Sequence, residues 1–491
     1  MAAVNPIARF LTRAGWLALA ITLSVLPAPA ATDPFDLPDF GSSADTVMTR
    51  AEERDLGQEF MKWVRKALPV SSDPVLTDYL QTLGQQLVAA SGNPGHYEFF
   101  LIDEPTVNAF AGPDGHIGIF AGLILAAQTE GELAAVIAHE LAHVSQDHLM
   151  RSFEAQRQMA LPATALLLAA AVLGATVDSN LGAAGLMGVQ GAAAQKQINF
   201  TRANEEEADR IGIDTLSRAG HNPYAMPGFF QRLARTNRVS KSEAPEFLRT
   251  HPVTSSRIAD ALNRARQHGQ RQRPDSLRFH LARANLRQQR ESNPTRAVEH
   301  FEKTLEQGRY RDETAQRYGY ALALMRAGRL DAARQQLAPL LDAHPTQTEF
   351  LVLQAEIDRR AGQPERAVRN LKGPVGLAPG NWPLNQAYAQ ALMSASRPAE
   401  ALSALERFAA IRPGIASIYE LMADAAGTSG QRALNYRYRA EYLYQIGELE
   451  PAIRQLQLAL RLNEIDFHLA SKIQVRLSEL QAQEKAREAR D

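Results

Sequence analysis

A 34-residue spacing of small residues and prolines in the C-terminal half restricts the fold of this chain more than any other feature. The spacing relates three sets of positions: Gly328 and Gly362; Ala333, Ala367 and Ala401; and Pro345, Pro379 and Pro413. A repeat of this length holds two helices, in which small residues allow close packing and a proline ends the second helix. One such pair cannot bury its apolar face alone, so neighbouring pairs must stack into an α-solenoid.

This period is that of tetratricopeptide repeats, and the array is expected to span residues 280–491. Three regular units carry the short sequence of the turn between their helices, beginning at Ala327, Ala361 and Ala395. The last has Ser396 where glycine is usual. Less regular units surround Ala297 and Ala452, so about five helix pairs are predicted, with a break near Gly427–Gln431. Such arrays bind extended peptides or partner proteins.

The sequence HELAH, which begins at His139, indicates a metal site on a helix. Histidines four residues apart lie on one helix face, so His139 and His143 can bind one ion while Glu140 reaches a water molecule beside it. Thr129 and Glu132 form an expected capping box, and helically spaced apolar residues follow. A polar pair on a solvated helix is the alternative, but histidines among core positions need buried partners. The first hypothesis is therefore a zinc hydrolase.

A catalytic zinc ion needs a third protein ligand and one open position. The candidate is the acidic segment Arg202–Asp209, which opens a second helical pattern. Glu205 and Asp209 share a helix face, so the first could bind the ion and the second could accept the remaining N–H of a ligand histidine. Spacing alone does not select Glu205 over Glu206 or Glu207, and a solvated acidic helix start is the alternative.

HELAH, the pattern RxxExxAD from Arg202 and the sequence Thr250-His251-Pro252 together resemble the Ste24/HtpX class of zinc metallopeptidases. The resemblance spans about residues 45–270. It implies a mainly helical α+β domain with a small β-sheet, expected at residues 31–270, and one Zn²⁺ ion. Carried over by position, it implies that the zinc ligands are His139, His143 and Glu205, that the catalytic carboxylate is Glu140, and that Asp209 orients a ligand.

His251 has two open roles. The oxyanion that develops during peptide hydrolysis needs a further donor, and an imidazole in a His-Pro turn could supply it. The same imidazole could instead bind zinc as a fourth ligand, which would close the site and keep the enzyme latent. A turn histidine with no role in catalysis is the third interpretation.

The segment Asn108–Phe120 contains a strong turn signal, Pro113-Asp114-Gly115, and the residues after it alternate as in a strand. In the class that the chain resembles, this part is an edge strand beside the cleft. An extended substrate segment could pair with such an edge with little sequence preference. His116 is interpreted as structural, because nothing relates it to the metal helix.

The N-terminal residues predict export. Arg9 and Arg13 precede an apolar stretch from Trp16 to Leu26, and Ala28-Pro29-Ala30 offers a cleavage site, so residues 1–30 are expected to be a signal peptide. An uncleaved anchor is the alternative, although the stretch is short for a membrane span of about 20 residues. The chain has no cysteine, which is compatible with an oxidising compartment. The expected location is the periplasm.

Residues 159–194 contain two uncharged runs, Met159–Val177 and Leu181–Ala194. Length alone permits a membrane span for the first run. Pro162 and the many alanines favour a lid or hairpin near the cleft, with membrane-surface contact and true spanning as alternatives.

At 491 residues the chain is too long for one core, and its net charge of −1 gives no reason to expect nucleic acid. A protease joined to a repeat array suggests that the repeats select clients or dock the enzyme. The resemblance implies a periplasmic role in quality control or assembly of outer-membrane proteins, with unfolded or misassembled β-barrel proteins and their assembly complex as partners. Two alternatives are a repeat-based chaperone or scaffold and an intramembrane prenyl-protein peptidase.

Overall fold

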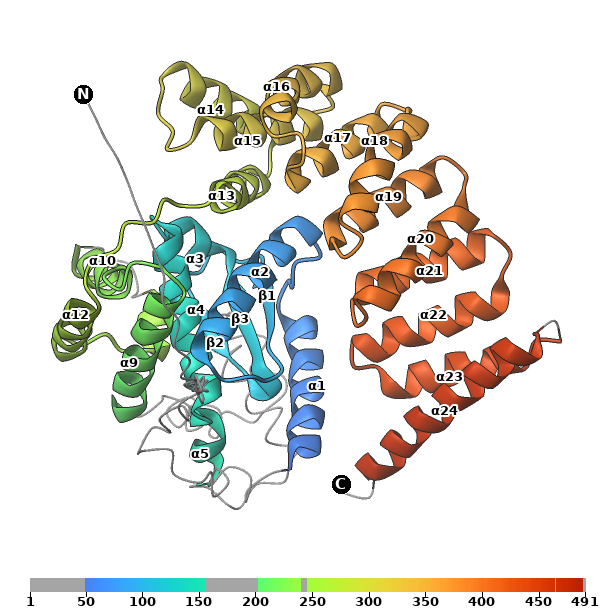
Figure 1. Ribbon diagram of the computed structural model, residues 1–491, viewed down its shortest axis with the longest axis horizontal. Coiled ribbons are helices and arrows are strands. Elements are labelled where there is room, and N and C mark those ends of the chain that lie inside the picture. Colours follow the sequence, from blue (N-terminus) through green and yellow to red (C-terminus); the bar gives the residue numbers. More distant parts are fainter. Residues whose placement is uncertain (1–48, 155–201, 240–244, 464, 489–491) are drawn as a thin grey trace, which may run out of the picture. The chain divides into compact units, whose positions relative to one another are not determined.

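The structure is a computed structural model that describes residues 49–154, 202–239, 245–463 and 465–488. The expected signal peptide and the expected lid at 159–194 lie outside the described residues. The described chain is mainly helical with one small sheet, as the sequence predicts (Figure 1). No helix in these ranges is both long enough and apolar enough to cross a membrane.

A three-stranded sheet precedes the helix that carries HELAH. Its strands are β1 (Glu98–Ile102), β2 (Ala109–Ala111) and β3 (His116–Phe120), in the spatial order β1-β3-β2. β3 pairs in parallel with β1 and antiparallel with β2. The expected turn lies between β2 and β3, where Gly115 has φ 73° and a Cβ atom would lie 1.9 Å from the His96 carbonyl oxygen. Only glycine fits there.

The sequence predicts an edge strand within Asn108–Phe120, and the structure confirms this for only one of the two strands in that segment. The edge strand within Asn108–Phe120 is β2, whereas the strand that follows the turn is the middle strand. Its second neighbour is β1, which lies earlier in the chain and is almost fully buried. A short buried strand reads as a continuous apolar run and gives no alternation that would reveal it.

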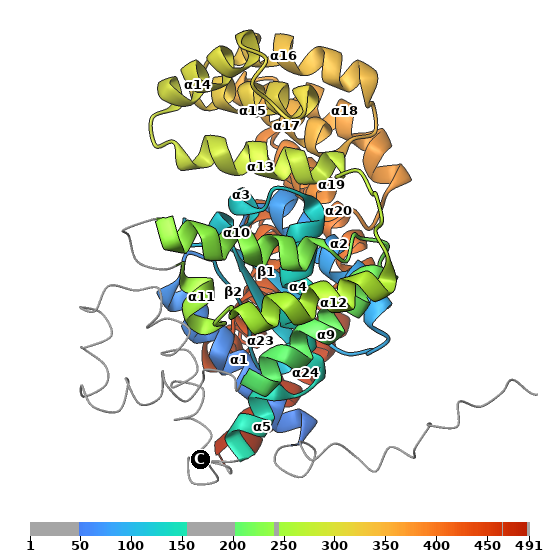
Figure 2. The same cartoon turned by 90° about the vertical axis from the view of Figure 1, so that its left-hand side faces the viewer.

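Helices surround the sheet and one another in the first part of the chain. They are α1 (Arg50–Ala67), α2 (Pro74–Ser91), α3 (Ala121–Ala126), α4 (Glu130–Ser145), α5 (His148–Glu154), α9 (Arg202–Arg218), α10 (Ala225–Val239), α11 (Glu246–Thr250) and α12 (Ser255–His268). α4 contacts α2, α9, α10 and the sheet, and every residue from Glu132 to His143 is buried. Figure 2 shows α9 and α10 beside α4, and α12 packs against α9 and α10. A helix covered on all sides is apolar all round, apart from residues that serve a site.

The repeat array consists, within the described residues, of six helix pairs. They are α13 (Leu277–Arg290) with α14 (Pro294–Glu306), α15 (Glu313–Arg326) with α16 (Leu330–Ala343), α17 (Thr348–Arg360) with α18 (Pro364–Leu377), α19 (Trp382–Ser394) with α20 (Pro398–Ile411), α21 (Ala416–Thr428) with α22 (Arg432–Gln445), and α23 (Leu449–Leu460) with α24 (Phe467–Glu488). From α14 to α24 each helix packs against the next, and α13 packs against α15. The prediction of an α-solenoid is therefore confirmed, with one pair more than expected.

The expected break near Gly427–Gln431 is wrong. Gly430 lies 34 residues after Ser396 and turns the chain between α21 and α22 with the same left-handed backbone, φ 77° against 58°. The irregularity comes one helix later, where Gly447, at φ 86°, joins α22 directly to α23 without the proline-containing loop of the earlier units. The 34-residue spacing of the turn residues therefore continues to Gly430, whereas the spacing of the prolines ends at Pro413.

The first array helix also belongs to the core of the preceding part. Phe279, Ala282 and Leu286 of α13 lie in one apolar cluster with Leu133 and Ile137 of α4. α13 therefore joins the two parts through shared packing as well as through the chain.

Candidate metal centre

α4 begins at the predicted N-cap, but its capping differs from the expected box. The Thr129 hydroxyl oxygen accepts a hydrogen bond from the Glu132 N–H at 3.2 Å. The Glu132 carboxylate accepts from the Gln128 N–H at 2.5 Å, instead of from Thr129, and from Arg232 at 2.6 Å. These contacts fix the start of the helix that carries the two histidines.

One ring nitrogen of His139 and one ring nitrogen of His143 lie next to each other. Their Nε2 atoms lie 3.1 Å apart, and both rings are fully buried. The opposite nitrogen of each ring is engaged: His139 Nδ1 lies 3.0 Å from Asp209 Oδ1, and His143 Nδ1 lies 2.8 Å from His148 Nδ1. Such outer contacts orient imidazoles for metal binding.

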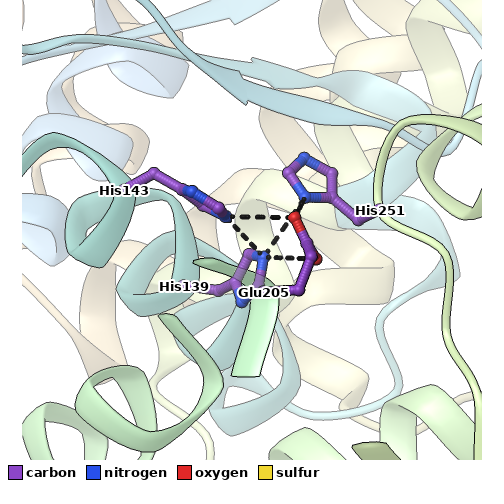
Figure 3. A group of neighbouring side chains, drawn as sticks. All are labelled: His139, His143, Glu205 and His251. Atoms are coloured by element: carbon purple, nitrogen blue, oxygen red, sulfur yellow. Dashed lines mark hydrogen bonds and ion pairs between the residues drawn. The ribbon is translucent and has the colours of Figure 1, made fainter. Parts of the chain in front are cut away.

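Glu205 reaches the same point from α9. Its Oε1 lies 3.4 Å from His143 Nε2 and its Oε2 lies 3.6 Å from His139 Nε2 (Figure 3). Glu206 is exposed, and Glu207 contacts His148 at 3.1 Å. The positions of the side chains thus distinguish Glu205 from Glu206 and Glu207, which sequence spacing alone cannot do.

His251 follows α11 and completes a group of four donors. Its Nδ1 lies 2.9 Å from Glu205 Oε1 and 3.3 Å from His139 Nε2, and its ring stacks on Phe247. One ligand atom from each of His139, His143, Glu205 and His251 can be chosen so that all lie within 4.8 Å of one another. Ligand atoms bound tetrahedrally to one zinc ion lie about 3.3 Å apart, so the donor set fits an ion of that size.

Glu140 is a buried carboxylate beside this group. Within the described residues neither of its oxygens has a hydrogen-bond partner, although His251 Nε2 lies 3.5 Å from Oε1. Burial raises the pKa of Glu140, and the positive charges of His251 and His139 offset part of this rise. Buried polar atoms without partners are rare and mark places where water or an ion binds. This observation, independent of the donor distances, also fits a metal site.

The protonation states of Glu205 and His143 suit metal binding. For His139, burial lowers the pKa but hydrogen bonds with Asp209 and Glu205 raise it to about 10, so an ion that binds there displaces a proton. Burial would raise the pKa of Glu205, but the charge of His251 and hydrogen bonds from the imidazoles hold it well below its usual value. Burial lowers the pKa of His143 well below its usual value. A charged carboxylate and a neutral imidazole are the forms that bind a metal.

Arg257 is a buried site residue that the sequence analysis missed. It donates two hydrogen bonds to Asp209, at 2.7 and 2.8 Å, and one to the Pro252 carbonyl at 2.9 Å. Its Nη1 lies 2.6 Å from Glu205 Oε2, so one guanidinium neutralises two carboxylates. A signal existed: Arg257 shares the buried stripe of α12 with Ala261 and Ala265, at four-residue spacing. An arginine in such a stripe needs a buried acid.

His148 is the second missed residue. It is fully buried at the start of α5, between His143 and Glu207, and Arg151 also lies 3.5 Å from that glutamate. Its position five residues after His143 is the only signal in the sequence. His116 lies outside the donor group: its Nδ1 donates to the Pro113 carbonyl at 2.8 Å and its Nε2 lies 3.2 Å from Glu98.

A buried His/Glu donor set on two packed helices, followed by a helical repeat array, defines a metallopeptidase with tetratricopeptide repeats. Residues 74–265 match peptidase family M48, and residues 289–357 match a tetratricopeptide repeat family. The β-barrel assembly-enhancing protease of Escherichia coli (strain K12) is 35% identical over 434 residues, 88% of each chain. That of Yersinia pestis is 35% identical over 418 residues, 85% of this chain and 86% of the other.

A putative β-barrel assembly-enhancing protease of Vibrio cholerae serotype O1 is 33% identical over 469 residues, 95% of this chain and 96% of the other. The chain therefore belongs to peptidase family M48, in the group of the β-barrel assembly-enhancing proteases. Members of this family are metallopeptidases, as the sequence predicts.

Proposed function

We propose that this chain is a periplasmic zinc-dependent endopeptidase that acts in the quality control or assembly of outer-membrane proteins. One observation carries the enzymatic part: the ligand atoms of His139, His143 and Glu205 converge beside the carboxylate of Glu140, which accepts no hydrogen bond from the described residues. We assign the three converging residues as zinc ligands and Asp209 as the residue that orients His139. The peptidase part is assigned to residues 31–270 and the array to residues 280–491.

The chemistry follows from these assignments. When bound, zinc supplies a Lewis acid that polarises the scissile carbonyl and lowers the pKa of a water molecule to about 7. Glu140 takes a proton from the attacking water and delivers it to the leaving amine as the C–N bond breaks. Asp209 and Arg257 hold His139 and Glu205 in place throughout.

His251 is assigned to the same site in one of two roles. Its Nδ1 lies among the other donor atoms, which supports a fourth-ligand role that keeps the enzyme latent. If the ring turns away from the ion, its position 3.5 Å from Glu140 leaves it able to donate to the developing oxyanion. The two roles predict opposite effects of removing the imidazole.

Substrate binding is assigned to β2. It is one of the two edge strands of the sheet and contacts α4. An extended segment of an unfolded protein can pair with such an edge through main-chain hydrogen bonds, with little sequence preference. Selectivity must then come from elsewhere, and we assign it to the array.

The proposed clients are unfolded or misassembled outer-membrane β-barrel proteins, and the proposed docking partner is their assembly complex. The name of the relatives supports this assignment. The signal peptide expected at residues 1–30 supports a periplasmic location. The alternative is a repeat-based periplasmic chaperone or scaffold with little proteolysis.

The test compares wild type, Glu205→Gln and Glu206→Gln, in which neighbouring glutamates on α9 are changed identically. We expect wild type and Glu206→Gln to bind about one zinc ion and to cleave casein, and Glu205→Gln to lose both properties. Equal zinc binding by both variants would contradict the ligand assignment. Wild-type zinc content without cleavage of casein or of an unfolded β-barrel protein would favour the chaperone.

A further inference from the structure

A small cavity lined mainly by basic side chains lies between α13 and α15, apart from the metal centre. Its volume is about 20 Å³. The residues that matter for its chemistry are His280, Arg283, Arg287, Arg311, Asp312 and Gln316. A space of this size encloses about one atom the size of a water oxygen.

The charges around the cavity do not balance. Among the residues that line it, three arginines face one carboxylate, that of Asp312, which leaves a formal charge of about +2; outside the lining, Asp275 lies 3.9 Å from His280. That carboxylate is already engaged, because it caps α15 by accepting from the Ala315 N–H at 2.7 Å. Among the residues that the structure describes, none of the three arginines forms an ion pair with a carboxylate.

The arginines repel one another in a partly desolvated place. Burial, together with the charges of Arg287 and Arg311, lowers the pKa of Arg283 to about 10, although the charges of Asp275 and Glu132 act in the opposite direction. Burial and the charge of Arg311 likewise lower the pKa of Arg287. Clustered cations of this kind are stabilised by a bound anion.

Two of the arginines are held in position by the backbone before α4. Arg283 donates to the carbonyl of Ile124 at 2.6 Å and to that of Ala127, and its guanidinium lies 5.3 Å from the centre of the Phe279 ring. Arg311 donates to the carbonyl of Gln128. Fixed guanidinium groups lose little freedom when they bind an anion.

A buried amide without a partner gives an independent indication of a ligand. Gln316 lines the cavity and is 5% exposed. Its side-chain Nε2 has no hydrogen-bond partner within the described part of the chain. A buried donor of this kind is costly unless a bound group accepts from it.

We propose that this cavity binds one phosphate-type oxyanion. One oxygen enters the cavity toward Gln316 and Arg283, and the remaining oxygens stay at the mouth, where Arg287 and Arg311 are exposed. Guanidinium groups match the geometry of phosphate oxygens and can bind them in pairs. The anion is either free phosphate or the phosphate of a larger molecule such as a lipid headgroup.

The test is calorimetric titration of the full chain with inorganic phosphate, at an ionic strength held constant with sodium chloride. Arg287→Gln is the test variant, because within the described residues this arginine forms no hydrogen bond or ion pair that the substitution would break. Arg309→Gln is the matched control: Arg309 is exposed, lies two residues from Arg311 and does not line the cavity. We expect saturable binding by wild type and Arg309→Gln, and at least tenfold weaker binding by Arg287→Gln.

Three results would overturn the proposal: no binding of phosphate up to about 10 mM, equal weakening in both variants, or equally strong competition by chloride. Sedimentation with phosphatidylglycerol vesicles identifies the source of the phosphate. Sedimentation that depends on Arg287, together with binding of free phosphate, supports a lipid headgroup, and binding of free phosphate alone supports a small anion. Binding to vesicles without binding of free phosphate would contradict the proposal that the cavity itself binds one phosphate group.

Discussion

Arg257 holds Asp209 by two parallel hydrogen bonds of 2.7 and 2.8 Å, and that carboxylate lies 3.0 Å from Nδ1 of His139. An arginine on α12 thus reaches the metal helix through one aspartate on α9. Because Arg257 also contacts Glu205 at 2.6 Å, it is the countercharge of both buried carboxylates.

Arg257→Gln should therefore weaken metal binding, although Arg257 is not itself assigned as a ligand. The variant leaves two buried carboxylates without their countercharge, and loss of such outer contacts typically lowers metal affinity about 10- to 100-fold. Zinc affinity, measured by competition with a chelating dye, checks this. The control is Arg264→Gln on the same helix, which removes the pairing with Asp214. Equal zinc affinities of the two variants would refute the role given to Arg257.

His251→Ala separates the two roles proposed for that residue. If His251 keeps the enzyme latent as a fourth ligand, casein cleavage should rise while zinc content stays at about one ion per chain. If it donates to the oxyanion, cleavage should fall by about 100- to 1,000-fold with zinc retained. Unchanged cleavage and zinc content would remove His251 from the mechanism.

Ser396→Gly should stabilise the array. Ser396 has φ 58°, while Gly328, Gly362 and Gly430 occupy the equivalent turns at 75°, 73° and 77°. A side chain costs roughly 1 kcal/mol in this left-handed region, so glycine should raise the free energy of unfolding by about that amount. Urea denaturation measures it. Gly362→Ser is the reverse control and should lower the stability; a destabilised Ser396→Gly protein would speak against this interpretation.

Local spacing explains which parts of the site could be predicted from sequence. His139, Glu140 and His143 lie within two helical turns, so the α-helix itself fixes their arrangement. The α-solenoid follows in the same way from a repeat whose units contact only their neighbours. In both cases contacts between residues that are close in the sequence determine the structure.

The missed features depend on tertiary contacts. Arg257 reaches Asp209 across 48 positions, and His148 reaches Glu207 across 59. Spacing alone could not select Glu205 over Glu206 and Glu207, because the choice depends on the rotation of α9 about its own axis, which packing against α4 determines; the family resemblance supplied that choice. β1 was missed because a strand buried on both faces shows no alternation.

The pairing of His96 with Asp114 predicts a pH dependence of stability. The hydrogen bond from His96 to the Asp114 side chain raises the pKa of His96 from 6.5 to about 9. Because the folded state binds the proton more tightly, the stabilisation is fully present below pH 6.5 and disappears as the pH rises through about 9. The side chain of His96 is 61% exposed, so solvent screening keeps the effect small.

His96→Gln checks this by urea denaturation at pH 6 and above pH 9. Wild type should be more stable than the variant at the lower pH and equal to it at the higher. A stability difference that is constant with pH would contradict the proposed protonation of His96.

The most direct measurement is zinc content together with casein cleavage for wild type and Glu140→Gln. We expect about one zinc ion per chain in both proteins, because Glu140 is not assigned as a ligand. We also expect cleavage by wild type and a loss of at least about 100-fold in the variant, because the proton-transferring group is gone. A wild-type protein that never acquires a metal ion, or a Glu140→Gln protein that cleaves casein as wild type does, would contradict the proposed zinc peptidase activity.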